Sequence, residues 1–185
     1  MKTLIFDGSP HRAGDTAALL AALQETLPGE KRIVRAYEAG IAPCLDCRFC
    51  QRHPACAQKD GMEEVYRWIE KSDAVVIASP LYFSQLTGPL LSLLSRLQAF
   101  YCARRFLGRE LAGGPKRGGL LLVGGGDGSP DPAVRTARCL LRLVNAADIA
   151  PAVLSLKTDL VPAAQDAAAL AAARELGEFL KKGFV

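Results

Sequence analysis

Short apolar runs alternate with longer stretches whose apolar residues recur at helical spacing along this chain of 185 residues. The apolar runs predict strands, and the amphipathic or alanine-rich stretches predict helices. The expected strands are residues 2–6, 32–36, 73–78, 118–123 and 151–156, and the expected helices are residues 16–27, 62–71, 89–97, 132–146 and 163–182. Residues 73–78, DAVVIA, form a continuous β-branched run typical of a strand buried on both faces.

This alternation indicates parallel βαβ units joined by right-handed crossovers. We therefore expect an α/β fold, a three-layer, doubly wound parallel five-stranded sheet, in one domain spanning residues 1–185 with a cysteine-rich loop inserted at about residues 40–60. In such sheets, ligands bind at the carboxyl ends of the strands. The loops expected at that edge are residues 7–15, 37–61, 79–88, 124–131 and 157–162.

The composition excludes several classes of partner. Hydrophobic residues make up 50% of the chain, enough for a sizeable core, and the net charge of +4 is spread without any basic run that would indicate a nucleic-acid partner. The apolar stretch near the N-terminus, residues 4–6, is too short for a signal peptide, and no window approaches the ~18 apolar residues of a membrane span. We expect a cytoplasmic protein with no membrane partner, in a compartment that keeps thiols reduced.

The stretch GSPHRAGDT connects the first expected strand to the N-terminus of the first helix, where free N–H groups and the helix dipole favour an anion. Ser9 and Thr16 supply hydroxyl donors there, and His11 or Arg12 adds positive charge. This pattern favours phosphate binding, and an ordinary loop capped by Asp15 or Thr16 is the alternative. The stretch matches neither a Walker P-loop nor G-x-G-x-x-G.

A second loop at the same edge, SPLYFSQLTGP, contains two adjacent aromatic residues, Tyr82 and Phe83, in a chain that is only 6% aromatic. Aromatic side chains in such a loop are poorly placed for a core but well placed to sandwich a flat heteroaromatic ring. Backbone groups of residues 81–84 can then bond the polar edges of that ring.

Four of the six cysteines occupy one short loop, with the spacing C-x2-C-x2-C-x5-C. They are Cys44, Cys47, Cys50 and Cys56. This spacing favours a 4Fe-4S cluster, as in bacterial ferredoxin runs, whereas zinc sites normally separate two C-x2-C pairs by a long spacer. A reduced or partly oxidised loop that holds no cluster is the alternative. The other two cysteines, Cys102 and Cys139, lie in helix-like stretches and are expected to be buried without a functional role.

The chain contains, in this order, GSPHRAGDT, the four-cysteine loop and SPLYFSQLTGPLLSLLSR. In the order and spacing of these segments, residues 1 to about 130 resemble the flavodoxin-like NADPH-dependent FMN reductases, especially their iron-sulfur flavoprotein branch. The resemblance implies a flavodoxin-like fold with strand order 2-1-3-4-5, bound FMN, NAD(P)H as electron donor, and a homodimer or homotetramer. In that branch the four cysteines bind the cluster, which lies near the flavin at a subunit contact. The expected cofactor-binding residues are Ser9, His11, Arg12, Asp15 and Thr16 at the phosphate, Pro80, Leu81, Tyr82, Phe83 and Ser84 at the isoalloxazine ring, and Gly124, Gly125, Gly126 and Asp127 in a third flavin loop.

Two residues depart from the family pattern, because His11 stands where the family usually has Arg and Asp15 where it usually has Asn. Both changes weaken phosphate binding. An ionised Asp15 would repel the phosphate unless its carboxylate caps the helix or pairs with Arg12. We expect FMN to bind regardless, because the helix N-terminus is intact, as is the loop of residues 79–89, which we call the ring loop.

The sequence thus predicts an FMN-dependent oxidoreductase that passes electrons from NAD(P)H to a small-molecule or protein acceptor. No catalytic acid or base is expected, since the flavin carries the chemistry and no G-x-S-x-G motif or metal-binding histidine pair is present. Two alternatives stay open: an electron-transfer flavoprotein that works between protein partners, and a redox-sensing module without flavin. An iron-sulfur cluster would favour the first of these alternatives.

Overall fold

The computed structural model describes residues 1–182 and contains six strands. The strands are β1 (Lys2–Asp7), β2 (Glu30–Arg35), β3 (Ala74–Pro80), β4 (Lys116–Gly124), β5 (Ala146–Ile149) and β6 (Val153–Leu156). The helices are α1 (Asp15–Thr26), α2 (Met62–Lys71), α3 (Gly88–Leu94), α4 (Gln98–Leu107), α5 (Asp131–Leu143) and α6 (Ala167–Lys181), with short 3-10 helices η1 (Phe49–Gln51), η2 (Ser95–Leu97) and η3 (Ala163–Gln165). Among these residues no helix combines the length and apolar character that crossing a bilayer requires.

All strand pairings are parallel, and the order β2-β1-β3-β4-β5 confirms the expected topology. The fifth position differs from the prediction because two short strands share it. β5 pairs with the start of β4, at Lys116–Gly118, and β6 pairs with its end, at Leu121–Gly124. Pro151 lies between the two strands, and a proline cannot donate a ladder hydrogen bond, so the edge strand is interrupted there.

The expected helix over residues 132–146 is too long at its C-terminus. It ends at Leu143, and Asn145 adopts a left-handed conformation with φ 64° before β5 begins. Asparagine tolerates this conformation better than most residues do, so it turns the chain from the helix into the strand. Ala146, the last residue of the predicted helix, therefore begins a strand that the sequence pattern did not reveal.

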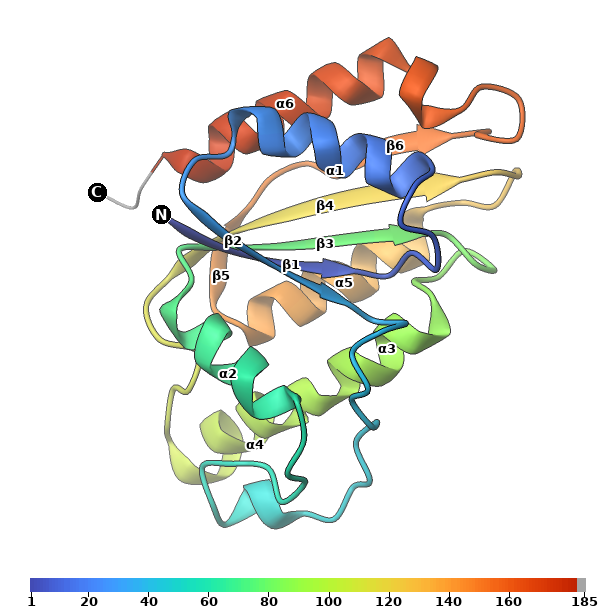
Figure 1. Cartoon of the computed structure of the whole chain (residues 1–185). Helices are drawn as coiled ribbons and strands as arrows, with labels where there is room; N and C mark the ends of the chain where they lie inside the picture. Colours follow the sequence, from blue (N-terminus) through green and yellow to red (C-terminus); the bar gives the residue numbers. More distant parts are fainter. Residues whose placement is uncertain (183–185) are drawn as a thin grey trace.

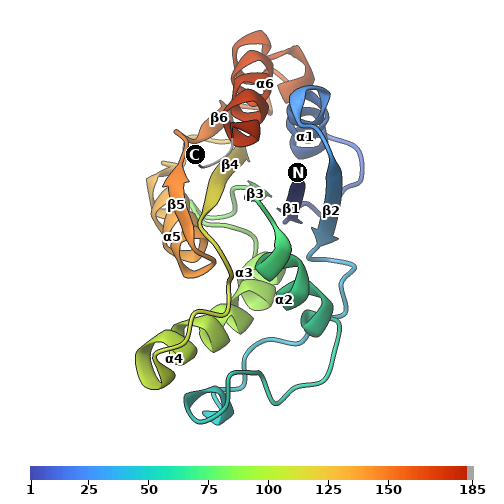
Figure 2. The same ribbon diagram turned by 90° about the vertical axis from the view of Figure 1, so that its left-hand side faces the viewer.

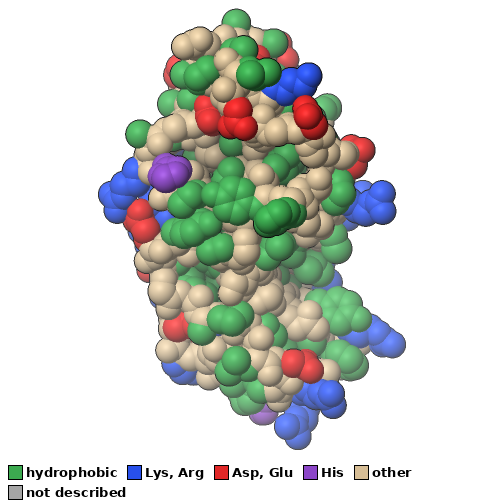
Figure 3. Space-filling view, turned by 90° about the vertical axis from the view of Figure 1, so that its right-hand side faces the viewer, with side chains coloured by type: hydrophobic (Ala, Val, Ile, Leu, Met, Phe, Trp, Pro, Cys, Tyr) green, Lys and Arg blue, Asp and Glu red, His purple; other side chains and the backbone are tan. Residues whose placement is uncertain are grey.

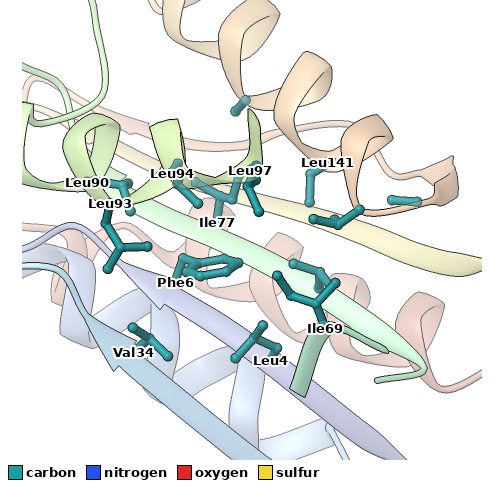
Figure 4. Packing of buried hydrophobic residues seen from close by; sticks show 14 of the residues in the cluster. Leu4, Phe6, Val34, Ile69, Ile77, Leu90, Leu93, Leu94, Leu97 and Leu141 are labelled. Atoms are coloured by element: carbon teal, nitrogen blue, oxygen red, sulfur yellow. The ribbon is translucent and has the colours of Figure 1, made fainter. Parts of the chain in front are cut away.

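The helices cover the sheet on both faces, as Figures 1 and 2 show. Successive residues of β1 point to opposite faces, so Ile5 packs in the core under α1 and α6, while Leu4 and Phe6 pack in the core under α2, α3 and α5. Figure 4 shows this second core, where Phe6 and Ile77 of the sheet meet Leu94 of α3. The expected three-layer architecture is confirmed.

Beyond α3, the chain continues through η2 into α4, which extends away from the sheet (Figures 1 and 2). The long loop after β2 folds back beneath α2 and α4, and η1 within it packs against α4. The loops that follow β1, β3, β4 and β6 lie at the right-hand side of Figure 1, where these parallel strands end. This arrangement separates the cysteine segment from the loops at the strand ends.

Candidate functional site

The phosphate loop, residues 8–16, begins at Gly8, which is tightly held by β3 and by the loop that follows β3. The Gly8 N–H donates to the carbonyl oxygen of Ala78 at 2.8 Å, and the Thr87 hydroxyl donates to the Gly8 carbonyl oxygen at 2.9 Å. A Cβ at position 8 would lie 2.7 Å from Leu90 Cδ2 and 2.9 Å from Ser79 Oγ. Only glycine therefore allows the phosphate loop and the ring loop to approach this closely.

Asp7, the last residue of β1, orders the start of the same loop from below. Its side chain is buried, Oδ1 accepts a hydrogen bond from the Ser9 N–H at 2.9 Å, and Oδ2 accepts from Arg35 Nη1 at 2.6 Å. Burial raises the pKa of Asp7 above its ordinary value, and the Ser9 N–H and the Arg35 charge oppose this shift. Asp7 thus fixes the backbone of Ser9 without facing the solvent.

The N-terminus of α1 keeps its backbone donors available. Gly14 precedes the helix with φ 141°, no side chain caps the helix, and among residues 1–182 the N–H groups of Asp15, Thr16 and Ala17 donate no hydrogen bond. Thr16 is buried at this end of the helix. Free N–H groups at a helix N-terminus are suited to an anion, so the geometry expected for a phosphate is present.

Asp15 was expected to repel a phosphate unless its carboxylate caps α1 or pairs with Arg12, and the structure shows neither arrangement. Its Oδ1 accepts a hydrogen bond from the Ala163 N–H at 2.7 Å, which ties α1 to η3 instead of capping α1 or pairing with Arg12. Arg12 makes a two-pronged ion pair with Glu38, at 2.9 and 2.7 Å. Glu38 therefore offsets the positive charge that Arg12 brings to the loop. The backbone N–H groups at the start of α1 remain for an anion, whereas the Ser9 hydroxyl donates to the His11 carbonyl oxygen at 3.1 Å.

The ring loop turns tightly around its two aromatic residues. Tyr82 and Gln85 exchange backbone hydrogen bonds at 2.9 and 3.0 Å, and Phe83 and Ser84 between them have φ of 52° and 61°. Two positive φ angles are typical of a hairpin turn that directs successive side chains apart. Tyr82 is about half exposed and Phe83 is fully exposed, at 102%.

Tyr37, which follows β2, reaches the same loop and was not predicted as part of the site. Its hydroxyl contacts the hydroxyls of Tyr82 and Thr87. Burial raises the pKa of Tyr37, and the neighbouring Tyr82 adds to the rise. Tyr82 is therefore held by a partner, whereas the ring of Phe83 is free to stack on a ligand.

The ring loop and the third loop enclose a common cavity of about 260 Å³. It is lined by Leu81, Phe83, Ser84, Gly124, Gly125, Gly126 and Gly128. Ligand cavities usually have volumes of about 300–1,000 Å³, so this one matches a part of a cofactor, such as a ring, better than a whole mononucleotide. The structure thus brings two of the predicted segments together, but Asp127 does not line the cavity.

The glycines of the third loop also accommodate an acidic residue that the sequence did not single out. A Cβ on Gly125 would lie 2.5 Å from Asp159 Oδ1, and the Thr158 N–H donates to the Gly124 carbonyl oxygen at 3.0 Å. The loop after β6 therefore lies against the third loop. Figure 3 shows this side of the molecule, with a band of hydrophobic side chains across the middle and acidic side chains above it.

Larger cavities lie elsewhere on the molecule, and one of them reaches the end of β2 at Arg35. One of about 420 Å³ is lined by residues that include Tyr66, Phe100 and Glu110, and one of about 320 Å³ by residues that include Arg32 and Trp68. Neither touches the three loops. Position at the carboxyl ends of parallel strands, rather than volume, therefore selects the 260 Å³ cavity as the candidate cofactor site.

The four cysteines of the long loop line one small cavity of about 20 Å³, together with Cys102 of α4. Cys102 is buried, as expected, but its place beside the loop cysteines was not foreseen, and Cys139 is exposed, which contradicts the prediction of burial. Burial raises the pKa of the Cys50 thiol to about 12, and a hydrogen-bond contact with Cys102 adds to this rise. Five thiols therefore share one environment.

Thiols are the donors that iron-sulfur clusters use, but the described residues are not arranged around a metal site. Within residues 1–182, no three Cys, His, Asp or Glu side chains converge closely enough to hold one metal ion. Each cysteine ligand of a 4Fe-4S cluster binds a different iron, so a cluster requires thiolates around a space rather than around a point. The cavity of about 20 Å³ holds roughly one water molecule, so it would have to widen around a cluster.

The thiols do not lie beside the ring loop within a single chain. In both Figure 1 and Figure 2, the cysteine loop lies beneath α4, well below the loops at the strand ends. The cysteine loop leaves the carboxyl end of β2, as expected, but within one copy of the chain it lies apart from the ring loop. The loop folds back because η1 packs on α4 rather than on the sheet.

The parallel order β2-β1-β3-β4-β5, with a free helix N-terminus and a cavity at the strand ends, defines a flavodoxin-like fold. The chain belongs to the NADPH-dependent FMN reductase family, whose family model matches residues 1–160. It is accordingly a flavin-dependent oxidoreductase. The resemblance inferred from the sequence is confirmed.

Curated relatives and solved structures agree with this assignment. The chain is 27% identical over 187 residues to an iron-sulfur flavoprotein of Archaeoglobus fulgidus, covering 100% of this chain and 80% of the relative. It is 33% identical over 145 residues to an iron-sulfur flavoprotein of Methanocaldococcus jannaschii, covering 74% of this chain and 68% of the relative. The fold is similar to NAD(P)H:quinone oxidoreductase from Methanothermobacter marburgensis, with a TM-score of 0.76, 15% identity and coverage of 100% and 98% of the two chains. It is also similar to an azoreductase from Bacillus anthracis str. Sterne, with a TM-score of 0.67, 16% identity and coverage of 97% and 99%.

Proposed function

We propose that this chain binds FMN at the strand ends and transfers electrons from NAD(P)H to a small-molecule or protein acceptor. The observation that carries the proposal is the free N-terminus of α1 and the cavity of about 260 Å³, both at the carboxyl edge of the sheet. FMN supplies reversible transfer of a hydride or of single electrons. The protein binds and orients the cofactor, and it needs no side-chain acid or base of its own.

In this proposal the backbone N–H groups at the start of α1, with the hydroxyls of Ser9 and Thr16, hold the phosphate. His11 is exposed in the same loop and can contribute to binding the phosphate. The segments Pro80–Ser84 and Gly124–Asp127 hold the ring, and Phe83 covers one of its faces. Asp15 is compatible with this role because its carboxylate bonds to the Ala163 N–H.

The experiment compares two glycine variants by FMN titration. A Cβ on Gly126 or on Gly114 would meet nothing within 4 Å, but only Gly126 lines the cavity. Gly126→Val is therefore expected to fold normally and to weaken FMN binding by at least about tenfold, a loss of about 1.4 kcal/mol. Gly114→Val is expected to bind FMN as the wild type does. Equal affinity in the two variants would place the ring elsewhere.

A second candidate function, electron transfer through a 4Fe-4S cluster and FMN between protein partners, is favoured by the thiols that share one cavity. The relatives cited above carry the name iron-sulfur flavoprotein, which supports the same idea. Because the thiols and the ring loop are apart in one chain, close approach of cluster and flavin would require a homodimer or homotetramer.

Anaerobic purification separates these candidates. Flavin bands with a broad iron-sulfur shoulder, and about four irons and four sulfides per chain, would support the cluster. Flavin bands alone would favour a reductase without a cluster, and a colourless protein that fails to take up FMN would support a redox-sensing module. Light scattering gives the oligomeric state in the same preparation.

A further inference from the structure

The cysteine loop is closed at its base by side chains of the segment between α3 and α4. We call this base the loop neck: residues 42–44 where the chain enters the loop and residues 58–60 where it leaves. Across the neck, Gln58 Nε2 donates to the Pro43 carbonyl oxygen at 3.0 Å. From η2, the Ser95 hydroxyl accepts a hydrogen bond from the Cys44 N–H at 2.9 Å.

Arg96 makes the most contacts in the neck. Its Nη1 donates to the Ala42 carbonyl oxygen at 2.9 Å and to Asp60 Oδ2 at 2.7 Å, while its Nη2 lies 3.2 Å from Asp60 Oδ1 and 3.4 Å from the Gln58 carbonyl oxygen. The Arg96 guanidinium therefore bonds both chain segments of the neck and the Asp60 carboxylate. The planar fork of arginine is suited to this task, and the ammonium of lysine is not.

Arg96 is also among the most deeply buried residues of the protein. Its exposed fraction is 1%, and its side chain lines the cavity that the thiols surround. The Cys56 thiol lines the same cavity as the guanidinium. Four of the contacts above use Nη1 and Nη2, but the buried Nε has no hydrogen-bond partner among the described residues. A buried donor without a partner costs free energy unless a ligand satisfies it.

We propose that Arg96 is the positioning residue of the cysteine site, which closes the loop neck through Asp60 and offers its remaining N–H and its charge to an anionic group among the thiols. The closing role follows from the contacts of the chain alone. The second role rests on the proposed cluster, because a cubane bound by four thiolates is anionic and carries sulfur acceptors. A buried cation beside it lowers the cost of placing that negative charge inside the protein.

The test measures hydrogen exchange in the cluster-free protein and iron uptake during anaerobic reconstitution. Arg96→Lys keeps the positive charge but loses the fork, so exchange of the amides in residues 44–58 is expected to rise at least about tenfold. Iron and sulfide per chain are expected to fall to less than half of the wild-type value. FMN affinity is expected to stay unchanged, because the neck lies far from the loops at the strand ends.

Two further variants keep the result interpretable. Arg104→Lys is the matched control, because Arg104 lies on α4 and pairs with Glu110 at 2.6 Å without lining the thiol cavity. Ser95→Ala removes the acceptor of the Cys44 N–H and the donor to the Ser92 carbonyl oxygen. It should raise exchange in the same segment, by a smaller factor, even if Arg96→Lys does not fold. The control should alter neither exchange in residues 44–58 nor iron uptake.

Several outcomes would overturn the proposal. Unchanged exchange in residues 44–58 of Arg96→Lys would refute the closing role. Exchange that rises equally throughout α2, α3 and α4 would show that Arg96 only supports the core. Normal iron uptake by an opened loop would refute the role toward the anionic group. If the wild type takes up no iron, the cluster proposal and the second role fail together, and the exchange measurement still decides the first.

Discussion

Replacing Thr87 with valine removes one hydroxyl while it preserves the shape of the side chain. Thr87 is fully buried, and its Oγ1 donates to the Gly8 carbonyl oxygen at 2.9 Å. This bond joins the ring loop to the phosphate loop. Valine cannot replace it, so the Gly8 carbonyl oxygen loses this donor in an environment that excludes water.

Leaving a buried acceptor unsatisfied costs about 1–3 kcal/mol, and we take about 2 kcal/mol for this site. A loss of 1 kcal/mol lowers the Tm of a domain of this size by about 2–4 °C, so Thr87→Val should melt about 4–8 °C below the wild type. A shifted Gly8 carbonyl also moves the neighbouring Ser9 N–H. FMN binding should therefore weaken by about three- to tenfold, or about 0.7–1.4 kcal/mol.

Thr87→Ser is the control, because it keeps the hydroxyl and loses a buried methyl group worth about 0.8 kcal/mol. Thermal unfolding without FMN and fluorescence titration with FMN should be measured for both variants. Thr87→Ser should lose some stability but bind FMN normally. If Thr87→Val binds FMN like the wild type and melts no lower than Thr87→Ser, the hydrogen bond to Gly8 does not hold the two loops together.

Three further predictions concern the ring, the third loop and the loop neck. Phe83→Ala should change the free energy of unfolding by less than about 0.5 kcal/mol, because the ring is fully exposed, but it should weaken FMN binding by about 0.5–1.5 kcal/mol in titration; normal affinity would show that Phe83 does not cover the flavin. Gly125→Ala should destabilise the protein by about 1–3 kcal/mol in urea unfolding through the clash with Asp159, and Asp159→Ala should restore most of the loss; no rescue would refute the clash. Burial would raise the pKa of Asp60, but the hydrogen bonds from Arg96 and from the Met62 N–H lower it below its ordinary value, so the stabilising contribution of Asp60 is present above about pH 4 and is lost as the pH falls through the lowered pKa. Amide exchange in residues 44–58, corrected for the intrinsic rate, should therefore rise steeply below about pH 4 in the wild type but not in Asp60→Asn. Parallel exchange curves for the two proteins would contradict this prediction.

The sequence predicted the central strands well, because a parallel strand buried on both faces requires a continuous apolar run. Residues 73–78 carry that signal, and β3 forms there. The fifth position of the sheet was harder to predict, since β5 contains only four residues, two of them exposed, and follows directly on an apolar helical pattern. Asn145 was the available signal, because asparagine is common where a helix turns into a strand.

The candidate site was predictable as a set of loops but not as a set of contacts. Topology alone brings the loops after β1, β3 and β4 to one edge, so their residues could be named in advance. Tyr37, Asp159 and Cys102 were missed because each joins the site through contacts with residues distant in the sequence. No local spacing encodes such contacts. The same reason explains why the partner of Asp15 was predicted incorrectly.

The interruption at Pro151 also bears on how this chain avoids sticking to its own copies. Exposed sheet borders can recruit a neighbouring molecule by adding strand to strand, which leads to fibrous aggregates. Here one border is broken into two pieces of four residues each, and the other border, β2, carries Lys31, Arg32 and Arg35 among its six residues. Both borders are therefore poor templates, and a Pro151→Val change that lengthens the first border should promote aggregation at high concentration.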